Sequence, residues 1–475
     1  MSAFVERPVV VVGGGLAGLT AAARIARGGR AVTLLESRPR LGGRATSFED
    51  AASGDLVDNC QHVGMGCCTA LQQFCREAGL GDLFRIEREL TFIDAQGRRS
   101  RFAAARLPAP LHLAPSFARL RYLRWRDRRA IARGLRELAR EQSVTSESFE
   151  DWLVRHRQPE PARRLFWHVV LVSALSETLD RIDVQAARKV FVDGFLSNAT
   201  GFELHLPTRP LDDLYGPPMQ RYLESLGVVV KTNTAVERLI PGEENRSRFT
   251  GVRLRNGDDV PASSVVLAVP WHRLGSLLEA SGVDRESDEA SALLTAGNLE
   301  HAPIASVHLW FERPIMTLPH AVLVDHLSQW VFARPPHAEG SLGHYYQVVI
   351  SASRDVLAQP REQTIAHVLN ELRSVFSDAV DNDVLRSRLV VEKRAVFSVR
   401  PGSDALRPAQ RTAFANLFLA GDYTQTGWPA TMEGAVRSGE LAAAALLGTD
   451  PMIPPDLPRG RLAKWFIGRA AVSPA

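Results

Sequence analysis

The sequence predicts an α/β fold built on a parallel sheet, and three observations near its start predict it. Val9–Val12 are all β-branched, which is typical of a strand buried on both faces. Gly13, Gly15 and Gly18 follow at once, in the spacing Gly-x-Gly-x-x-Gly, and lead into an alanine-rich helical stretch. A second apolar strand, "AVTLLE", then ends on the acidic residue Glu36.

Length and composition indicate a folded protein with more than one core. The chain has 475 residues, 45% of them hydrophobic and 23% charged. A chain of this length exceeds what one hydrophobic core usually supports, so we expect two domains. No run of 18 apolar residues occurs, which predicts no membrane-spanning helix. Glu6 and Arg7 precede the first apolar run, and glycines end it early, so it is not a signal peptide.

The first glycine motif has the features of a dinucleotide site. Gly13 allows a tight turn, Gly15 lets the backbone approach a pyrophosphate, and Gly18 lets the helix pack on the strand. The first helical turn, which includes Ala17, brings free N–H groups and a partial positive charge to the phosphates. Glu36 stands where a carboxylate accepts the ribose hydroxyls. The alternative is a glycine turn that binds no ligand.

A second glycine motif narrows the choice of dinucleotide. The stretch "RPRLGGRATSF" follows Glu36 and contains Gly43 and Arg44. It resembles the second phosphate-contacting motif of flavoproteins of the amine oxidase and phytoene desaturase superfamily. The resemblance implies FAD as the cofactor, with Arg44 as a cation for the pyrophosphate and Gly43 allowing close approach. The alternative is a plain turn.

The C-terminal segment "NLFLAGDYTQTGWPATMEGAVRSG" matches the same superfamily. It reads as a short strand, Gly421 and Asp422, a loop, and a helix from about Met432. The resemblance implies that Asp422 hydrogen-bonds the ribityl chain and that Met432 brings a helix N-terminus to the flavin. It also implies that the backbone of Val236 holds the adenine, although Val236 alone is equally a core residue. Glu433 is interpreted mainly as a first-turn acid that favours the helix.

These segments predict a discontinuous domain organisation. We expect a Rossmann-like FAD-binding domain of the glutathione reductase/amine oxidase type, assembled from residues 1–90, 210–290 and 395–450. A mixed α+β substrate domain is expected to be inserted as residues 91–209 and 291–394. Residues 451–475 form a proline-rich, basic tail.

One further stretch, "VDNCQHVGMGCCTAL", indicates one particular family within this superfamily. It is similar to a segment of the squalene-associated FAD-dependent desaturases, or hydroxysqualene dehydroxylases, and departs from their pattern at Cys60 and Cys68. Trp428 is a third departure, in the C-terminal motif. The resemblance implies a step of hopanoid biosynthesis, in which reduced flavin gives a hydride to hydroxysqualene and squalene forms. The alternatives are a carotenoid or phytoene-type desaturase, an amine oxidase, and an FAD-stabilised protein without activity.

The same stretch supplies the candidate catalytic residues. Dehydroxylation needs a proton for the leaving hydroxyl and apolar walls that keep water from an allylic cation. His62 is the candidate acid, Asp58 is the partner expected to raise its pKa, and Gln61 is expected to donate to a flavin carbonyl. Alternatively, His62 is structural and Asp58 only caps the turns that follow it.

The cysteines and the single dinucleotide motif bear on cofactors and location. Four cysteines lie within sixteen positions and lack Cys-x2-Cys spacing, so we expect reduced, buried thiols rather than a redox or metal site. Reduced thiols favour a cytoplasmic protein. No second Gly-x-Gly-x-x-Gly appears, so a separate electron donor is expected. No metal is predicted.

Positive charge is concentrated in one region of a chain whose net charge is only +4. Thirteen arginines and two acidic residues lie between Arg98 and Arg140. From Ser116 to Glu141, apolar residues recur at helical spacing opposite these arginines, and Asp127 is a candidate start of a second helix. The pattern predicts either an anionic membrane surface, where a hydrophobic triterpene substrate would enter, or a helix with a solvated arginine face. No recognition motif for nucleic acid accompanies the arginines.

Overall fold

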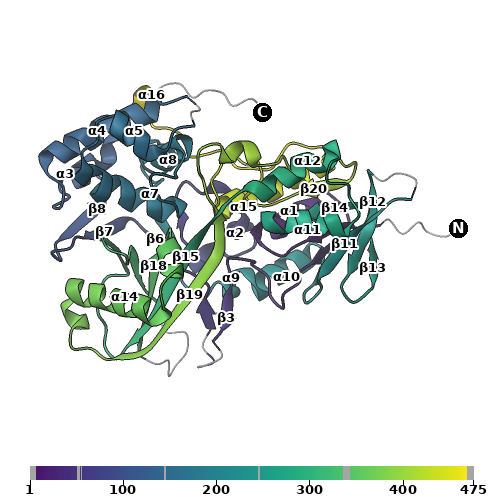
Figure 1. The fold of residues 1–475 in the computed structure, drawn as a ribbon, viewed down its shortest axis with the longest axis horizontal. Helices are drawn as coiled ribbons and strands as arrows, with labels where there is room; N and C mark the ends of the chain where they lie inside the picture. The colour runs from purple at the N-terminus through teal and green to yellow at the C-terminus, as the bar shows by residue number, and fades with distance from the viewer. Residues whose placement is uncertain are drawn as a thin grey trace.

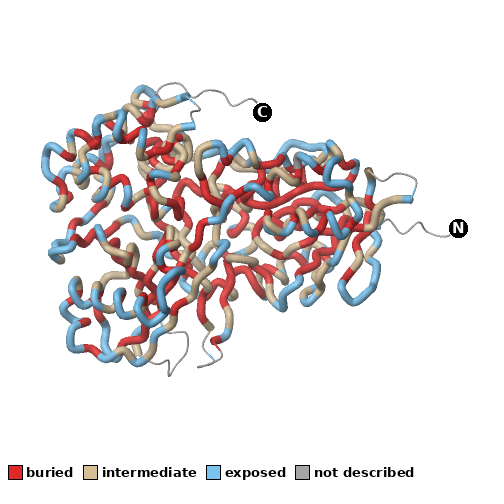
Figure 2. The backbone as a smooth tube through the Cα atoms, viewed as in Figure 1, coloured by how far each residue is buried: buried red, intermediate tan, exposed pale blue. Residues whose placement is uncertain are grey.

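The computed structural model describes residues 7–50, 54, 56–143, 146–243, 247–334 and 343–467. Figure 1 shows two regions joined along the middle of the molecule: a parallel sheet with its helices on the right, and a sheet covered by helices on the left. Figure 2 shows buried backbone running through both regions and exposed backbone mainly around the rim. The arrangement agrees with the predicted α/β fold and its additional mixed α+β region.

The predicted parallel sheet is present. Its five strands lie in the order β10-β2-β1-β14-β20, and all pair in parallel. The strands are β1 (Val9–Val12), β2 (Val32–Leu35), β10 (Val229–Lys231), β14 (Ser264–Leu267) and β20 (Leu417–Leu419). Segments from the start, middle and end of the chain therefore form one sheet, as the glycine motifs and the C-terminal segment require.

Two helices bring the ends of the chain together beside this sheet. Helix α1 (Leu16–Arg27) follows β1, and α15 (Met432–Leu447) follows β20. They pack so closely that a Cβ atom added at Gly439 would lie 2.4 Å from the carbonyl oxygen of Ala17. Helix α15 begins at Met432, as the sequence predicts, and Thr431 caps it by accepting from the Gly434 N–H. Close packing fixes both helix N-termini at the same edge of the sheet.

The remaining elements of this region lie next to β10 and β14 in the chain. An antiparallel sheet of three strands comprises β11 (Val236–Pro241), β12 (Phe249–Leu254) and β13 (Asp259–Pro261). Helices α10 (Pro217–Ser225), α11 (Trp271–Ala280), α12 (Asp288–Leu294) and η5 (Thr295–Asn298) complete it.

The second region is organised around a seven-stranded mixed sheet. Its order is β19-β15-β18-β17-β16-β7-β8, and β16 pairs in parallel with β7. The strands are β7 (Glu89–Ile93), β8 (Arg99–Ala103), β15 (His301–Phe311), β16 (His320–Leu323), β17 (Trp330–Ala333), β18 (His344–Ile350) and β19 (Val384–Phe397). Helices α13 (Arg354–Leu357), α14 (Arg361–Val375) and η6 (Ser377–Ala379) follow β18, and η7 (Ser403–Leu406) follows β19.

A helical layer comes from the insertion between β8 and β10. It contains η2 (Leu111–Leu113), α3 (Ala114–Ala118), α4 (Trp125–Arg140), α5 (Phe149–Arg155), α6 (Glu160–Ala162), η3 (Arg163–Trp167), α7 (His168–Leu175), α8 (Val184–Phe191) and η4 (Val192–Leu196). Two small sheets, β3 (Ser47–Glu49) with β4 (Leu56–Asp58), and β5 (Gly64–Met65) with β9 (Leu204–Pro207) and β6 (Phe84–Glu87), link the regions. Helices α2 (Thr69–Glu77) and η1 (Gly81–Leu83) lie between β5 and β6 in the chain, and α9 (Asp212–Tyr215) follows β9.

The basic segment forms two helices, α3 and α4, with Asp127 in the first turn of α4, where its carboxylate accepts from the Arg124 N–H at 3.1 Å. The C-terminal tail is ordered as far as it is described. Helix α16 (Arg461–Ile467) packs on α4, burying Ala463 and Ile467. The rest of the predicted tail, residues 468–475, lies outside the described residues. No described helix is long and apolar enough to cross a membrane.

Candidate functional site

The first glycine motif forms a turn in which each glycine has a different environment. Gly13 has φ +115°, and an added Cβ would lie 2.6 Å from the Ala268 carbonyl oxygen. A Cβ at Gly18 would lie 1.9 Å from the Gly13 carbonyl oxygen, so helix and strand need glycine there to pack. A Cβ at Gly15 would meet only the Gly43 Cα, at 3.8 Å. Folding therefore requires Gly13 and Gly18, whereas Gly15 leaves space at the α1 N-terminus that fits a pyrophosphate.

Glu36 is held in place at the end of β2 by the backbone. Its carboxylate accepts from the Gly14 N–H at 2.7 Å and from the Arg38 N–H at 2.8 Å. The Thr234 N–H donates to the Glu36 carbonyl oxygen at 2.8 Å, so the chain just before Val236 lies against the end of β2. Val236 opens β11 and is half-buried. Glu36 and Val236 thus belong to one neighbourhood, which suits a ribose and an adenine.

The two glycine motifs contact each other directly. The Gly42 N–H donates to the Gly14 carbonyl oxygen at 2.8 Å, and a Cβ at Gly43 would lie 3.0 Å from the Gly15 Cα. Arg44 comes next and reaches the C-terminal segment, where its guanidinium donates to the Asp422 carboxylate at 2.6 Å and to the Ala395 carbonyl oxygen at 2.7 Å. Residues predicted for the pyrophosphate and for the ribityl chain are therefore adjacent.

The C-terminal motif is fixed by small residues and by a buried acid. A Cβ at Gly421 would lie 2.2 Å from the Tyr423 ring, so glycine is needed there. Glu433 is fully buried, accepts from the Ala70 and Leu71 N–H groups at 3.1 and 2.8 Å, and pairs with Arg437 at 2.6 Å. Glu433 is therefore more than a first-turn acid of α15, because it also holds the N-terminus of α2 against that of α15.

Asp58 is buried, and its carboxylate connects three separate segments of the chain. Its carboxylate accepts from the Ser47 hydroxyl at 2.7 Å and from the Leu211 N–H at 2.9 Å, and pairs with Arg334 at 2.6 Å. The Leu211 N–H lies at the start of α9, so Asp58 caps a distant helix rather than the turns that follow it. The side chains of Asp58 and Arg334 are only 2% and 3% exposed.

Asp58 acts on His62 through its charge, in the predicted direction, but burial outweighs it. The Nδ1 atom of His62 lies 2.9 Å from the Cys60 carbonyl oxygen, while the Asp58 carboxylate is bound by other groups. The pKa of His62 is lowered, chiefly because burial penalises the charged imidazolium, although the negative charge of Asp58 acts in the opposite direction. Burial therefore lowers the share of His62 side chains that carry the proton which a general acid must donate.

Gln61 is oriented by two contacts. Its Oε1 accepts from Arg334 at 2.9 Å and its Nε2 donates to the His62 carbonyl oxygen at 3.1 Å. The donation to a flavin carbonyl stays a prediction. The roles assigned to the other site residues also stay predictions.

Two arginines that organise this site were missed by the sequence analysis. Arg334 follows β17 and binds both Asp58 and Gln61 across more than 270 positions. Arg407 is buried and donates to the carbonyl oxygen of Asp422 at 3.2 Å and to the Thr426 hydroxyl at 2.9 Å. No motif surrounds either residue, so their partners become visible only in three dimensions.

The cysteines are free and buried, as predicted. Burial raises the pKa of Cys60 and of Cys75 to about 12, which makes both thiols poor nucleophiles and metal ligands. In the part of the chain that the structure describes, no cluster of histidine, cysteine and acidic residues could hold a metal ion.

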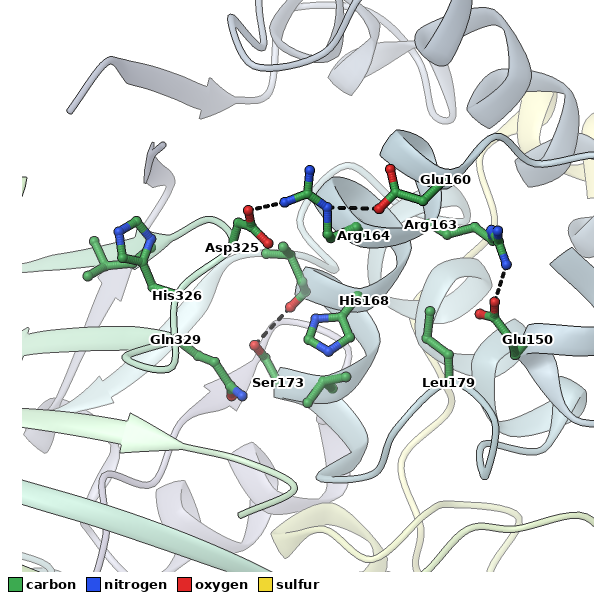
Figure 3. Close-up of a pocket in the computed structure, with 13 residues that line it drawn as sticks. Glu150, Glu160, Arg163, Arg164, His168, Ser173, Leu179, Asp325, His326 and Gln329 are labelled. Carbon is green, nitrogen blue, oxygen red and sulfur yellow. Dashed lines mark hydrogen bonds and ion pairs between the residues drawn. The ribbon is translucent and has the colours of Figure 1, made fainter. Parts of the chain in front are cut away.

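A cavity of about 590 Å³ lies in the second region, between η3, α7 and the β16–β17 connection (Figure 3). None of the predicted site residues lines it. Its charges are largely paired with one another: Arg163 with Glu150, and Arg164 with Glu160 and Asp325. The predicted flavin site is therefore separate from this cavity.

Comparison with known sequences gives one family and a consistent set of relatives. Residues 16–447 match the family described as flavin containing amine oxidoreductase. A 15-cis-phytoene desaturase of an Oncidium hybrid cultivar is 28% identical, over 92% of this chain and 77% of its own. A probable zeta-carotene desaturase of Synechococcus elongatus is 26% identical, over 92% of this chain and 98% of its own.

Solved structures share the fold. An oxidoreductase from Methanosarcina mazei superposes with a TM-score of 0.70 at 17% identity, covering 91% of this chain and 98% of its own. A putrescine oxidase with bound putrescine superposes with a TM-score of 0.68 at 18% identity, covering 94% and 99%. At these identities the likeness shows a common architecture.

Proposed function

The chain belongs to the flavin containing amine oxidoreductase family and is an FAD-dependent oxidoreductase, and from this premise we propose that it moves a hydride between FAD and a carbon of a long isoprenoid. The bound flavin supplies the hydride acceptor or donor. The turn at Gly15, the Glu36 carboxylate and the Arg44–Asp422 pair would hold the cofactor.

The match along 92% of the chain to enzymes named as phytoene and zeta-carotene desaturases carries this proposal. Desaturation is accordingly the first candidate reaction. A hydride leaves one carbon for the flavin, a proton leaves the neighbouring carbon, and a double bond forms between them. A separate electron acceptor must then reoxidise the flavin, because the sequence contains no second dinucleotide motif.

Reductive dehydroxylation of hydroxysqualene to squalene, a step of hopanoid biosynthesis, is the second candidate. The stretch around Asp58, Gln61 and His62, together with the C-terminal motif, favours it. In this direction the hydroxyl leaves with a proton, a hydride takes its place, and a separate electron donor reduces the flavin. Both reactions need a dry apolar wall beside the reacting carbon.

One paired experiment tests the proposal. Oxidised holoenzyme is incubated with phytoene and a quinone acceptor, and dithionite-reduced holoenzyme with hydroxysqualene, both without oxygen. Conjugated polyene absorption in the first reaction supports desaturation. Squalene formation with flavin reoxidation in the second supports dehydroxylation. If neither product forms while the flavin is fully loaded, the proposed isoprenoid chemistry is wrong.

An exposed surface formed by α3, α4, α16 and the residues before α3 would suit an anionic membrane. Trp125 and Trp465 are 58% and 75% exposed, and Leu107, Leu111 and Leu462 are also exposed. Exposed arginines surround them: Arg119, Arg121, Arg124, Arg126, Arg129, Arg133 and Arg136. Aromatic side chains enter the lipid interface while arginines bind its phosphates. We propose that this surface docks on anionic lipid, where a hydrophobic triterpene or carotenoid dissolves.

A further inference from the structure

The seven-stranded sheet has two buried faces of different chemistry. One face packs against α14 and is apolar along β15, with Ala305, Val307, Leu309 and Phe311. It continues across the neighbouring strands with Val331, Tyr346, Val348 and Ile350, and forms a core with Val368 and Leu372 of α14. An apolar face against a helix is what folding requires.

The opposite face carries polar and aromatic side chains although it is also buried. Strand register places His308 opposite Gln347, Gln347 opposite Phe332, and Phe332 opposite His320, in one row across four strands. His308 and Gln347 have no exposed surface. Trp330 and Phe332 stack beside this row, with ring centroids 5.5 Å apart. Polar side chains buried in such a row need hydrogen-bond partners.

His308 and Gln347 each have one polar atom without a hydrogen-bond partner among the described residues. His308 Nδ1 lies 2.6 Å from the Tyr345 hydroxyl, but its Nε2 is unpaired. Gln347 Nε2 donates to the Ser306 hydroxyl at 3.0 Å, but its Oε1 is unpaired. A buried polar atom without a partner destabilises the folded protein. His308 and Gln347 are direct cross-strand neighbours, with Cβ atoms about 5 Å apart.

The two unpaired atoms define what a group that pairs with both must be. Burial and the charge of Arg334 lower the pKa of His308 to about 3, so its imidazole is neutral. If the Tyr345 hydroxyl donates to Nδ1, then Nε2 carries a hydrogen and donates, while Gln347 Oε1 accepts. A hydroxyl group accepts from the first and donates to the second. In the other tautomer both atoms accept, and a water molecule with two hydrogens satisfies them.

We propose that His308 and Gln347 form a binding site for one hydroxyl oxygen, supplied either by an alcohol group on the substrate or by a fixed water. This rests on the proposed function, because the site lies beside the segment predicted to pass along the flavin. The Cys60 thiol hydrogen-bonds the Ser306 hydroxyl, which in turn holds Gln347. The site thereby selects between an isoprenoid alcohol and an isoprenoid hydrocarbon.

The test compares two ligands with one carbon skeleton, hydroxysqualene and squalene. Each is titrated into oxidised holoenzyme, and binding is followed by the change in flavin absorbance. We expect the alcohol to bind at least about tenfold more tightly than the hydrocarbon, since the hydrocarbon leaves the buried polar atoms unpaired. His308→Phe and Gln347→Leu should each bring the two affinities close to parity and leave the affinity for squalene within about twofold.

A matched control lies on the same strand but on the apolar face. Val348→Ala should lower thermal stability by opening a cavity and leave the ratio of the two affinities unchanged. FAD content and the melting temperature show whether His308→Phe and Gln347→Leu are folded. The double variant removes both unpaired atoms together, so it remains informative if a single variant unfolds.

The water alternative has its own outcome. If wild type shows no preference for the alcohol, a crystal structure of the holoenzyme should hold a water within hydrogen-bond distance of His308 Nε2 and Gln347 Oε1, and His308→Phe should lose it. Equal affinities together with no such water would overturn the proposal. Failure of the proposed function is a separate result, because it is measured by product formation rather than by binding.

Discussion

Arg334 is the residue whose removal best tests the architecture of the site. It joins the end of β17 to the segment that contains Asp58 and Gln61, and its side chain is only 3% exposed. Arg334→Met keeps much of the buried volume and removes the positive charge. It leaves the Asp58 carboxylate buried without its ion-pair partner.

The expected cost follows from the contacts that remain. Breaking a buried ion pair by removing one partner costs about 3–5 kcal/mol. Asp58 keeps hydrogen bonds from the Ser47 hydroxyl and the Leu211 N–H, so we expect the lower end, about 3 kcal/mol. Asp58→Asn should cost a similar amount. The double variant should lose less free energy of unfolding than the sum of the two single losses, by at least about 2 kcal/mol. The reason is that neither charge is then buried without its partner.

The assay is urea unfolding of holoenzyme at fixed FAD concentration, since bound cofactor adds to stability. Arg253→Met is the control, because the Arg253–Asp259 pair is solvent-exposed and its loss should not move the midpoint measurably. Equal midpoints for the Arg334 and Arg253 variants, or a double variant that costs the full sum, would refute the reasoning.

Three other predictions follow from single residues. Gly15→Ala should fold normally, but fluorescence titration should show that it binds FAD about 100-fold more weakly. Gly18→Ala should not accumulate as folded protein, because the added Cβ would lie 1.9 Å from a main-chain oxygen. Burial alone lowers the pKa of His112 from 6.5 to about 4, so its contribution to stability is present above pH 6.5 and is lost as pH falls towards 4. His112→Phe should therefore show up to about 3 kcal/mol less acid destabilisation in unfolding titrations from pH 7 to 4, and an unchanged pH profile would contradict this. Trp465→Ser should reduce flotation with anionic liposomes at low salt, whereas Val380→Ser, which removes another exposed apolar residue away from this surface, should not; equal flotation of both argues against the docking surface.

The parallel sheet and its turn were accessible from the sequence because their signals are local. Val9–Val12, the glycine spacing and Glu36 lie within 28 positions, and each glycine has a steric reason at its own position. The helix that begins at Met432 was predictable for the same reason, since a cap, a glycine-containing loop and a short strand precede it. The relatives then support FAD but favour desaturases over the dehydroxylase named first.

The catalytic neighbourhood was predicted less well because its partners are distant in the chain. The sequence placed Asp58 beside His62, four positions away, and assumed that the two side chains interact. In the structure Asp58 binds Arg334, which stands 276 positions further on, and burial lowers the pKa of His62. For the pKa of His62, desolvation outweighs the nearby charge of Asp58, and the charge of Arg44 acts in the same direction as desolvation.

By itself, the sequence determined the cofactor fold, the buried thiols and the concentration of arginine in one segment, since steric demands and local periodicity are written in neighbouring residues. Only the tertiary structure decided which charges pair, which face of the second sheet is polar, and that His308 and Gln347 stand side by side. Hydrogen-bond partners and desolvation depend on segments that meet in space, and strand register across a long insertion is set by packing rather than by any local pattern.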